Sequence, residues 1–255
     1  SGLGAKAHPP EKTHDTRYLP PRGAMMSPEQ PKDIQGSAGD AATAPLPDDK
    51  DKLPAFLTDL TEEAKLGKID EIYFRDDEIR EIKRSLNRKE NPNIMLTGHQ
   101  GVGKTAIVQR LALEISRKEA GYGLDDYRIL TLDAAGFIAA SGGTADGFGA
   151  LVRYMINLVS DGKTILFIDE MHIFSGRNSI PGVTSNFYEF LKPALASGKI
   201  RVIGATTLEE YKNYISGNKA FCQRFTILEI KPPLRSGAKD ILFAIKESYE
   251  AAQNK

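Results

Sequence analysis

The chain of 255 residues can hold one large domain or two small ones, and 40% of its residues are hydrophobic, which suffices for a core. Its 34 basic and 34 acidic residues balance to zero formal charge, which argues against binding to nucleic acid or membrane surfaces mainly by charge. No apolar run approaches the length of a membrane span. Cys222 is the single cysteine, so no disulfide can form within the chain, and we expect a reducing, cytoplasmic compartment. The chain begins with Ser1 and lacks a basic-then-apolar leader, so we expect a fragment of a longer protein.

Residues 1–53 differ in composition from the rest of the chain. They hold more than half of the fourteen prolines, and Tyr18 is their one aromatic residue. Such a segment cannot bury enough apolar surface to offset the entropy of ordering it. We therefore expect a disordered linker or tail, followed by a folded domain from residue 54.

Two helices are expected before the first strand. Leu57, Leu60 and Ala64 recur at helical spacing, and Asp59 or the threonine before it is a suitable first residue. A second amphipathic helix is expected at roughly residues 77–89, with a basic outer face. Acidic residues interleave that face, which favours a solvated surface over a nucleic-acid site.

The segment Gly98-His99-Gln100-Gly101-Val102-Gly103-Lys104-Thr105 fits the phosphate-binding pattern of a P-loop, G-x-x-x-x-G-K-[ST]. An apolar strand precedes it at residues 94–97 and a helix follows at 106–115, which disfavours a glycine-rich turn that fits by accident. Glycines let consecutive N–H groups face a polyphosphate, and the helix N-terminus adds partial positive charge. Lys104 is expected to neutralise the β- and γ-phosphates, and the Thr105 hydroxyl to hold Mg²⁺.

A second strand is expected at residues 128–133, and the stretch 134–149 is predicted to be a mobile loop or a frayed helix because it lacks an apolar pattern. A helix at 148–159 follows. Residues 164–170 then read Thr-Ile-Leu-Phe-Ile-Asp-Glu, a strand buried on both faces that ends in Asp169 and Glu170.

A strand ending in two carboxylates about 60 residues after a P-loop matches the Walker B pattern. Asp169 is expected to bind Mg²⁺ directly or through water, and Glu170 to polarise the attacking water. The alternative is a pair of surface carboxylates at a strand end.

Further strands are expected at residues 200–207 and 226–230, with a last amphipathic helix at 238–252. Thr206 and Thr207 end the first of these strands and could contact the γ-phosphate, or they could simply cap the next helix. Five short strands alternating with helices predict an α/β fold with a parallel sheet.

Six segments in a fixed order carry a family resemblance. They are Gly67-Lys68-Ile69-Asp70, Arg75-Asp76, Gly98 to Thr105, Ile165 to Glu170 with His172, Leu191-Lys192-Pro193-Ala194-Leu195, and Ile203-Gly204-Ala205-Thr206-Thr207. Together they resemble the first nucleotide-binding domain of the Clp AAA+ ATPases (ClpA, ClpB and ClpV), over roughly residues 57–249.

The resemblance implies a P-loop AAA+ core whose five-stranded parallel sheet, of order 5-1-4-3-2, is flanked by helices. The large subdomain would span residues 54–234, and 235–255 would begin a truncated helical lid. The resemblance also implies a homo-oligomeric ring, usually a hexamer, with ATP or ADP and Mg²⁺ between neighbouring subunits, and a protein substrate or partner.

The resemblance assigns roles residue by residue. Ile72 and Tyr73 would lie against the adenine. The phosphate cradle would comprise Gly98, His99, Gln100, Gly101, Val102, Gly103, Lys104, Thr105 and Ala106. The catalytic set would be Lys104, the Walker B Glu170, the sensor-1 residue Thr207 and the arginine finger Arg224, with Thr105 and Asp169 holding Mg²⁺. The alternative for Arg224 is an ordinary surface arginine.

Three departures from the family pattern matter. Gln223-Arg224 supplies one arginine where Clp domains usually carry two. The segment Ser141 to Gly147 lacks the aromatic residue of the family's pore loop; Phe137 or Phe148 could substitute for it, but both are more simply explained as core residues. Phe74 stands where the family has the glycine of Gly-Arg-Asp.

We therefore expect an Mg²⁺-dependent ATPase that remodels or disassembles a protein partner. The alternative, favoured by the missing aromatic residue, is a nucleotide-gated assembly or scaffold module that does not thread polypeptide. A GTPase is disfavoured because Asn218-Lys219 is not followed by the residues of a guanine-reading Asn-Lys-x-Asp segment. The balanced charge disfavours a DNA-acting member of the family.

Overall fold

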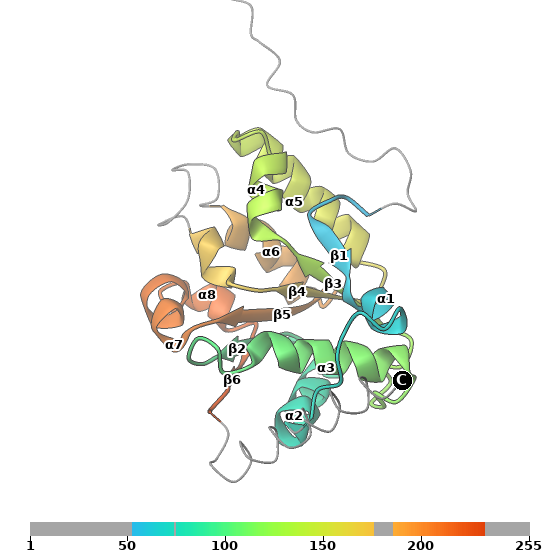
Figure 1. Ribbon diagram of the computed structural model, residues 1–255. Coiled ribbons are helices and arrows are strands. Elements are labelled where there is room, and N and C mark those ends of the chain that lie inside the picture. Colours follow the sequence, from blue (N-terminus) through green and yellow to red (C-terminus); the bar gives the residue numbers. More distant parts are fainter. Residues whose placement is uncertain (1–52, 74, 176–185, 233–255) are drawn as a thin grey trace, which may run out of the picture. The chain divides into compact units, whose positions relative to one another are not determined.

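The computed structural model of the chain describes residues 53–73, 75–175 and 186–232 (Figure 1). The expected tail, apart from Leu53, lies outside these residues, as do Phe74, the lid segment 235–255 and the helix expected at 238–252. Among the described residues, no helix combines the length and the apolar character needed to cross a membrane.

The described strands form one six-stranded sheet of order β1-β3-β4-β5-β2-β6. The strands are β1 (Leu57–Asp59), β2 (Ile94–Thr97), β3 (Arg128–Leu132), β4 (Thr164–Ile168), β5 (Arg201–Thr206) and β6 (Thr226–Glu229). The β2 to β6 strands are parallel and follow the expected order 5-1-4-3-2 when numbered from β2. The expectation of a wholly parallel five-stranded sheet was incomplete, because β1 adds a sixth strand antiparallel to β3.

The extra strand explains why the first helix begins later than its apolar spacing suggested. Leu57 pairs with Leu132 of β3 and therefore belongs to the sheet. The Asp59 carboxylate accepts hydrogen bonds from the N–H groups of Thr61 and Glu62, both at 3.0 Å. This side-chain cap starts α1 (Leu60–Lys65), so Asp59 is one of the two starting residues that the sequence offered.

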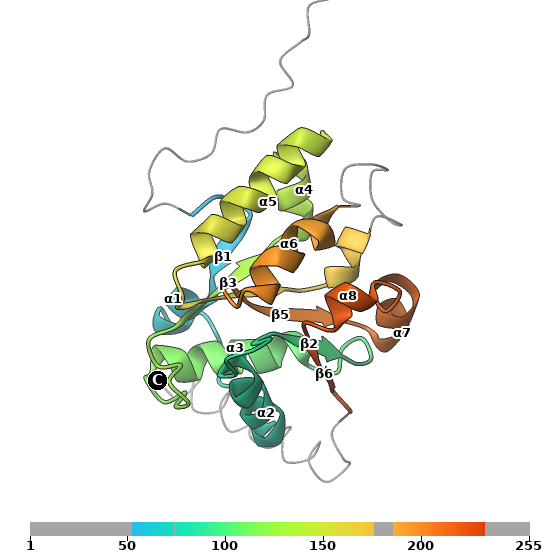
Figure 2. The same ribbon diagram turned by 180° about the vertical axis from the view of Figure 1, so that it is seen from behind.

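The helices cover both faces of the sheet (Figures 1 and 2). They are α2 (Asp76–Leu86), α3 (Lys104–Ser116), α4 (Ala134–Ala140), α5 (Ala145–Val159), α6 (Phe187–Ala196), α7 (Leu208–Glu210) and α8 (Lys219–Cys222), with the 3₁₀ turn η1 (Met171–Ser175) and the π-helical turn η2 (Tyr211–Ile215).

Alternating strand residues divide the buried side chains into two cores, because successive side chains of a strand point to opposite faces. In β4, Ile165 and Phe167 pack with α1, α2 and α3, whereas Leu166 and Ile168 pack with α4, α5 and α6. Every residue of β4 is buried, as expected for a strand covered on both sides.

The stretch 134–149 is more regular than its composition suggested. Asp133 caps α4 and Thr144 caps α5 through their side-chain oxygens, which accept hydrogen bonds from the N–H groups of Ala135 and Gly147. Phe137 and Phe148 are fully buried and meet edge to face, with ring centroids 5.4 Å apart. These caps and two buried rings stabilise helices in a segment whose other residues are mostly small.

The topology brings the P-loop, the Asp169-Glu170 pair and Thr207 to one edge of the sheet. The strands β4, β5 and β2 are neighbours and run parallel. The P-loop follows β2, the Asp169-Glu170 pair follows β4, and Thr207 follows β5. Because the carboxyl ends of parallel strands share one edge, this edge is the candidate site.

Candidate functional site

The P-loop is a tight turn between β2 and α3 that depends on its glycines. Gly101 and Gly103 have φ angles of 73° and 99°, which residues with a side chain rarely adopt. A Cβ on Gly98 would lie 2.5 Å from the carbonyl oxygen of Ile230, so the loop begins in close backbone contact with the residue after β6. Gly103 precedes α3 and contributes no side-chain cap, which leaves the first N–H groups of the helix available to an anion.

The Lys104 side chain lies inside the P-loop. Its Nζ donates hydrogen bonds to the carbonyl oxygens of Gly98 and His99, both at 3.1 Å, and the residue is 7% exposed. The loop backbone therefore holds a buried positive charge at the centre of the expected phosphate cradle.

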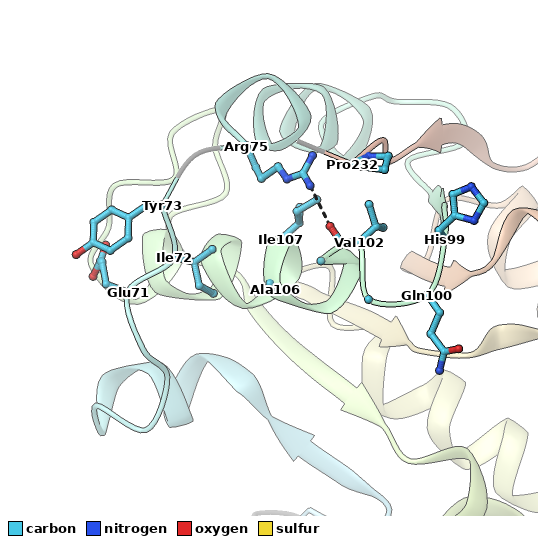
Figure 3. A pocket seen from close by; sticks show the side chains of 12 residues that line it. Glu71, Ile72, Tyr73, Arg75, His99, Gln100, Val102, Ala106, Ile107 and Pro232 are labelled. Atoms are coloured by element: carbon cyan, nitrogen blue, oxygen red, sulfur yellow. Dashed lines mark hydrogen bonds between the residues drawn. The ribbon is translucent and has the colours of Figure 1, made fainter. Parts of the chain in front are cut away.

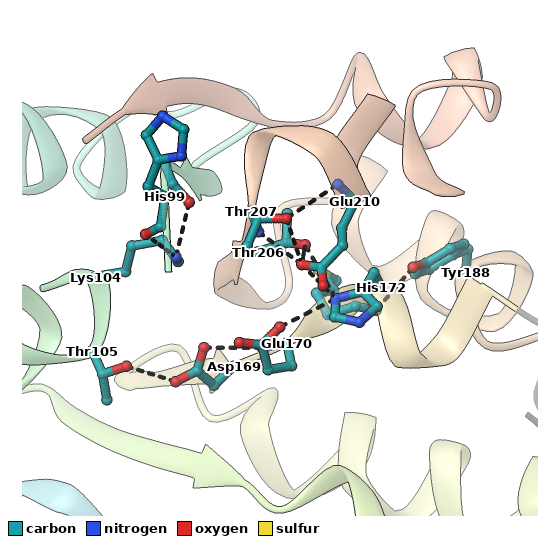
Figure 4. A network of polar contacts seen from close by, with 12 residues as sticks. His99, Lys104, Thr105, Asp169, Glu170, His172, Tyr188, Thr206, Thr207 and Glu210 are labelled. Carbon is teal, nitrogen blue, oxygen red and sulfur yellow. Dashed lines mark hydrogen bonds and ion pairs between the residues drawn. The ribbon is translucent and has the colours of Figure 1, made fainter. Parts of the chain in front are cut away.

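Thr105 and Asp169 come into direct contact from two separate strands. The Thr105 hydroxyl donates a hydrogen bond to Asp169 Oδ2 at 2.7 Å, and Asp169 Oδ1 accepts one from the Glu170 N–H at 2.9 Å (Figure 4). A hydroxyl and a carboxylate are the hard oxygen ligands that Mg²⁺ prefers. The donor set at this point fits Mg²⁺ as the sequence predicts.

The Glu170 side chain points away from Asp169 toward His172 and Glu210 (Figure 4). Its Oε2 lies 3.3 Å from His172 Nδ1, which lies 3.2 Å from Glu210 Oε2. Burial, followed by the charges of Glu210 and Asp169, raises the pKa of Glu170 above its usual value, which makes it a stronger base. Ligand atoms of Glu170, His172 and Glu210 lie within 4.8 Å of one another, a spacing that also allows a metal ion, although hydrogen bonding already accounts for these contacts.

Thr207 lies beside the P-loop but is engaged as a helix cap. Its hydroxyl donates to Glu210 Oε2 at 2.7 Å and accepts from the Glu210 N–H at 3.1 Å, while the Glu210 carboxylate accepts from the Thr207 N–H at 3.0 Å. This reciprocal capping box starts α7. Burial acts to raise the pKa of Glu210, but the hydrogen bonds from Thr207 and the nearby His172 outweigh it and lower that pKa.

A cavity of about 520 Å³ lies on one side of the P-loop (Figure 3). Ile72 and Tyr73, the residues expected to contact adenine, line it together with Ala106 and Ile107 of α3. We call it the adenine-side cavity. A second cleft of about 680 Å³ lies on the other side, between His99-Gln100 and the segment Thr207 to Tyr214. We call it the sensor-side cleft.

Arg75 is a residue of this site whose role the sequence analysis missed. Its guanidinium donates to the carbonyl oxygen of Val102 at 2.9 Å (Figure 3). It also donates to the carbonyl oxygen of Lys231 at 2.8 Å and pairs with Glu78 at 2.8 Å. Arg75 thereby ties the P-loop to the segment after β6 and to α2. In the sequence, only the Arg75-Asp76 pair of the family pattern singled out Arg75, and that pattern did not indicate its role.

Arg224 lies at the opposite edge of the sheet from the P-loop. Thr226 pairs with Ile94 at the start of β2, whereas the P-loop follows the end of β2, roughly 13 Å away at about 3.3 Å per residue. One terminal nitrogen of Arg224 donates to the Ala220 carbonyl oxygen, and its buried Nε has no hydrogen-bond partner among the described residues. The chain does not bring Arg224 to its own P-loop.

The segment Ser141 to Gly147 runs from the end of α4 into the first turn of α5 and carries no aromatic side chain. Residues 142–146 are exposed, and Thr144 caps α5. Phe137 and Phe148, the two candidate substitutes, belong to the core and are unavailable at the surface.

The comparisons with known proteins agree with this arrangement. Residues 94–228, more than half of the chain, match the ATPase family associated with various cellular activities (AAA). The chain belongs to this family. ClpB of Enterococcus faecalis is 38% identical over 239 residues, 92% of this chain and 27% of that protein. Heat shock protein 104 of Schizosaccharomyces pombe is 39% identical over 202 residues, 78% of this chain and 22% of that protein.

Solved structures of Hsp104 share the fold of this AAA ATPase. An Hsp104–ADP complex from S. cerevisiae superposes with a TM-score of 0.67 at 32% identity, over 77% of this chain and 27% of that one. A closed-state complex of Hsp104 with ATPγS and FITC-casein gives 0.68 at 32% identity, over 77% and 33%. The chain is thus a Clp-type AAA+ ATPase, and it spans about a quarter of the length of the curated relatives cited.

Proposed function

We propose that this ATPase binds ATP together with Mg²⁺ between neighbouring copies of the chain and uses hydrolysis to remodel or disassemble a protein partner. The observation that carries the proposal is the 2.7 Å hydrogen bond between Thr105 and Asp169, with Lys104 inside the adjacent loop. It joins the P-loop hydroxyl to the Walker B carboxylate, the two groups expected to share one cation.

Each residue has a chemical task in this proposal. Lys104 and the N–H groups of the P-loop bind the phosphates, and Thr105 and Asp169 hold Mg²⁺, which supplies charge neutralisation when bound. Glu170 accepts a proton from the attacking water, a task suited to its raised pKa. Thr207 orients the γ-phosphate or the water, and Arg224 of a neighbouring copy stabilises the transferring phosphoryl group.

The partner and the assembly belong to the same proposal. The names of the relatives, a chaperone protein and a heat shock protein, and the casein in one Hsp104 structure support a protein substrate. We infer a homo-oligomeric ring, a hexamer by the Clp resemblance, because Arg224 lies too far from its own P-loop to act there. The balanced charge supports neither nucleic acid nor membrane insertion as part of the function, and the single cysteine suits the cytoplasm.

Steady-state ATPase measurements on the assembled protein test the proposal. Lys104→Ala should lose nucleotide binding and hydrolysis together. Glu170→Gln should bind ATP as the wild type does and lose hydrolysis by about 10²-fold or more, because a general base contributes that much. A wild type that binds ATP yet hydrolyses it no faster than Glu170→Gln would contradict the enzymatic role.

A second candidate is a nucleotide-gated assembly module that releases its partner without threading it. The aromatic-free segment 141–147, exposed at residues 142–146, favours it, because threading by stacking against this loop lacks the ring that would stack. ATP-dependent release of a folded partner with no unfolding of that partner, monitored by its intrinsic fluorescence, would favour this module over a threading machine.

A further inference from the structure

His172 occupies the centre of the polar network and belongs to none of the roles assigned above. It follows β4 in η1, its side chain is 12% exposed, and its ring stacks on Tyr214 with centroids 6.0 Å apart and planes at 28°. One ring nitrogen, Nδ1, faces three oxygens: Glu170 Oε2 at 3.3 Å, Glu210 Oε2 at 3.2 Å and Thr206 Oγ1 at 3.2 Å.

The hydrogen-bonding partners of Nδ1 determine whether this nitrogen carries a hydrogen. An ionised carboxylate can only accept hydrogen bonds, so a nitrogen between two carboxylates has to carry a hydrogen. A single N–H that is shared between Glu170 and Glu210, which lie 3.3 and 3.2 Å from Nδ1, gives each of them a weaker hydrogen bond than it would give one alone. The two carboxylates therefore compete for the same donor.

The competitor of Glu170 is fixed in place. Glu210 accepts hydrogen bonds from the hydroxyls of Thr206 at 3.2 Å and Thr207 at 2.7 Å, and from the Thr207 N–H. These contacts anchor the Glu210 carboxylate to the end of β5. Among the described residues, the Glu170 carboxylate has no comparable anchor apart from His172.

The same network reaches the sensor-side cleft. Thr207, Glu210 and Tyr214 line that cleft, and each of the latter two contacts His172. A change at the cleft that strengthens or weakens the hydrogen bond from Nδ1–H to Glu210 therefore also changes the hydrogen bond that Nδ1–H makes to Glu170. A path of direct contacts thus runs from Thr207 through Glu210 and His172 to Glu170 (Figure 4).

We propose that His172 is a positioning residue, whose Nδ1–H orients the Glu170 carboxylate and couples it to the Thr207–Glu210 end of β5. This inference rests on the proposed role of Glu170 as the base. It assigns His172 an effect on the hydrolytic step and none on the capture of nucleotide, because the P-loop and the adenine-side cavity do not contact it.

Two polar substitutions of His172 separate this role from mere packing. Asparagine places an amide N–H at the position of Nδ1, since both branch from Cγ, whereas glutamine places it one bond farther out. His172→Asn should keep kcat within about three-fold of the wild type. His172→Gln and His172→Ala should lower kcat by about ten-fold, part of the 10²-fold or more that a general base contributes, with KM for ATP and binding of fluorescent ADP unchanged within two-fold.

Measurements on the Glu170→Gln variant distinguish a failure of the positioning role of His172 from a failure of the proposed function. If Glu170 is the base, adding His172→Ala to Glu170→Gln should lower the residual rate no further. Equal rates for His172→Asn and His172→Gln, or a loss of kcat that only follows a loss of folded protein in thermal melts, would overturn the positioning role and leave the base intact. Wild-type rates in Glu170→Gln alone would instead overturn the proposed function.

Discussion

The adenine-side cavity and the sensor-side cleft share two residues, His99 and Gln100, and otherwise differ in chemistry. The first has a mainly apolar lining that includes Ile72, Val102 and Ile107, with Glu71 and Arg75 beside them. The second is more polar, with threonine, glutamate, lysine and asparagine side chains beside Leu208 and Tyr214. An apolar cavity recognises a ligand by burying its surface equally before and during a reaction. A polar cleft can respond to charge that develops in the transition state.

This difference predicts that ATP affinity and turnover should depend on different sets of residues. Substitutions on the adenine side should change affinity, and substitutions on the sensor side should change turnover. Arg224 extends the comparison to a third place, because it lies at the far edge of the sheet and can serve either cleft only in another copy.

Removal of the arginine should have the largest effect. Arg224→Ala should lower the ATPase rate by about 10³-fold with ATP binding retained, because an arginine finger acts on the transition state. Steady-state kinetics of the assembled protein measure this loss. Gln223→Ala, the exposed neighbour, is the matched control and should keep the wild-type rate.

A mixing experiment decides whether Arg224 acts between copies. Arg224→Ala and Glu170→Gln should each be inactive alone, and their mixture should recover activity at sites that combine an intact base with an intact finger. An inactive mixture that still co-assembles would assign Arg224 to the surface.

Thr207 should have an intermediate effect, and its two roles can be told apart. Thr207→Asn keeps a good helix cap but replaces the hydroxyl, so it should fold as the wild type does and lose about ten-fold in kcat. Thr207→Ser keeps both functions and serves as the control. If Thr207→Asn retains the wild-type kcat and only Thr207→Ala melts earlier, by the loss of about 1 kcal/mol of capping, then the residue is a cap and nothing more.

Ile72 should have the smallest effect and only on affinity. Ile72→Ala removes part of the apolar lining and should weaken ATP binding by about ten-fold, near 1.4 kcal/mol, with kcat unchanged. Titration with fluorescent ADP and the KM for ATP measure the change. A fall in kcat at unchanged affinity would contradict the division between the two clefts.

Much of the core followed from the sequence because its signals are local. The uninterrupted apolar runs of β2 and β4 predicted buried strands, and the P-loop pattern predicted the turn between β2 and α3. The strand order came from the family resemblance, because apolar runs by themselves do not tell which strand lies beside which.

The errors arose where tertiary contacts overrule a local pattern. Leu57 has helical spacing to Leu60, yet pairing with Leu132 makes it part of a strand. The segment 134–149 lacks a periodic pattern, yet two caps and the buried Phe137 and Phe148 make it helical.

The candidate site was predictable as a set of residues and not as a network. Its P-loop and Walker B residues stand out by motif. The approach of Glu210 to His172, 38 positions earlier in the chain, follows from the adjacency of β4 and β5 and has no trace in local sequence. Arg75 was visible only as a family residue, and its hold on Val102 and Lys231 required the structure.

Because the P-loop and Arg224 lie at opposite edges of the sheet, the number of complete sites depends on how the copies are arranged. If Arg224 completes the site of a neighbouring copy in a head-to-tail contact, each copy gives its arginine to one neighbour and receives one from the other. An open row of n copies would therefore complete n − 1 sites and leave one unfinished at its end. Activity per chain would rise with every copy added, and closure of the row would complete the last site without adding any chain at all.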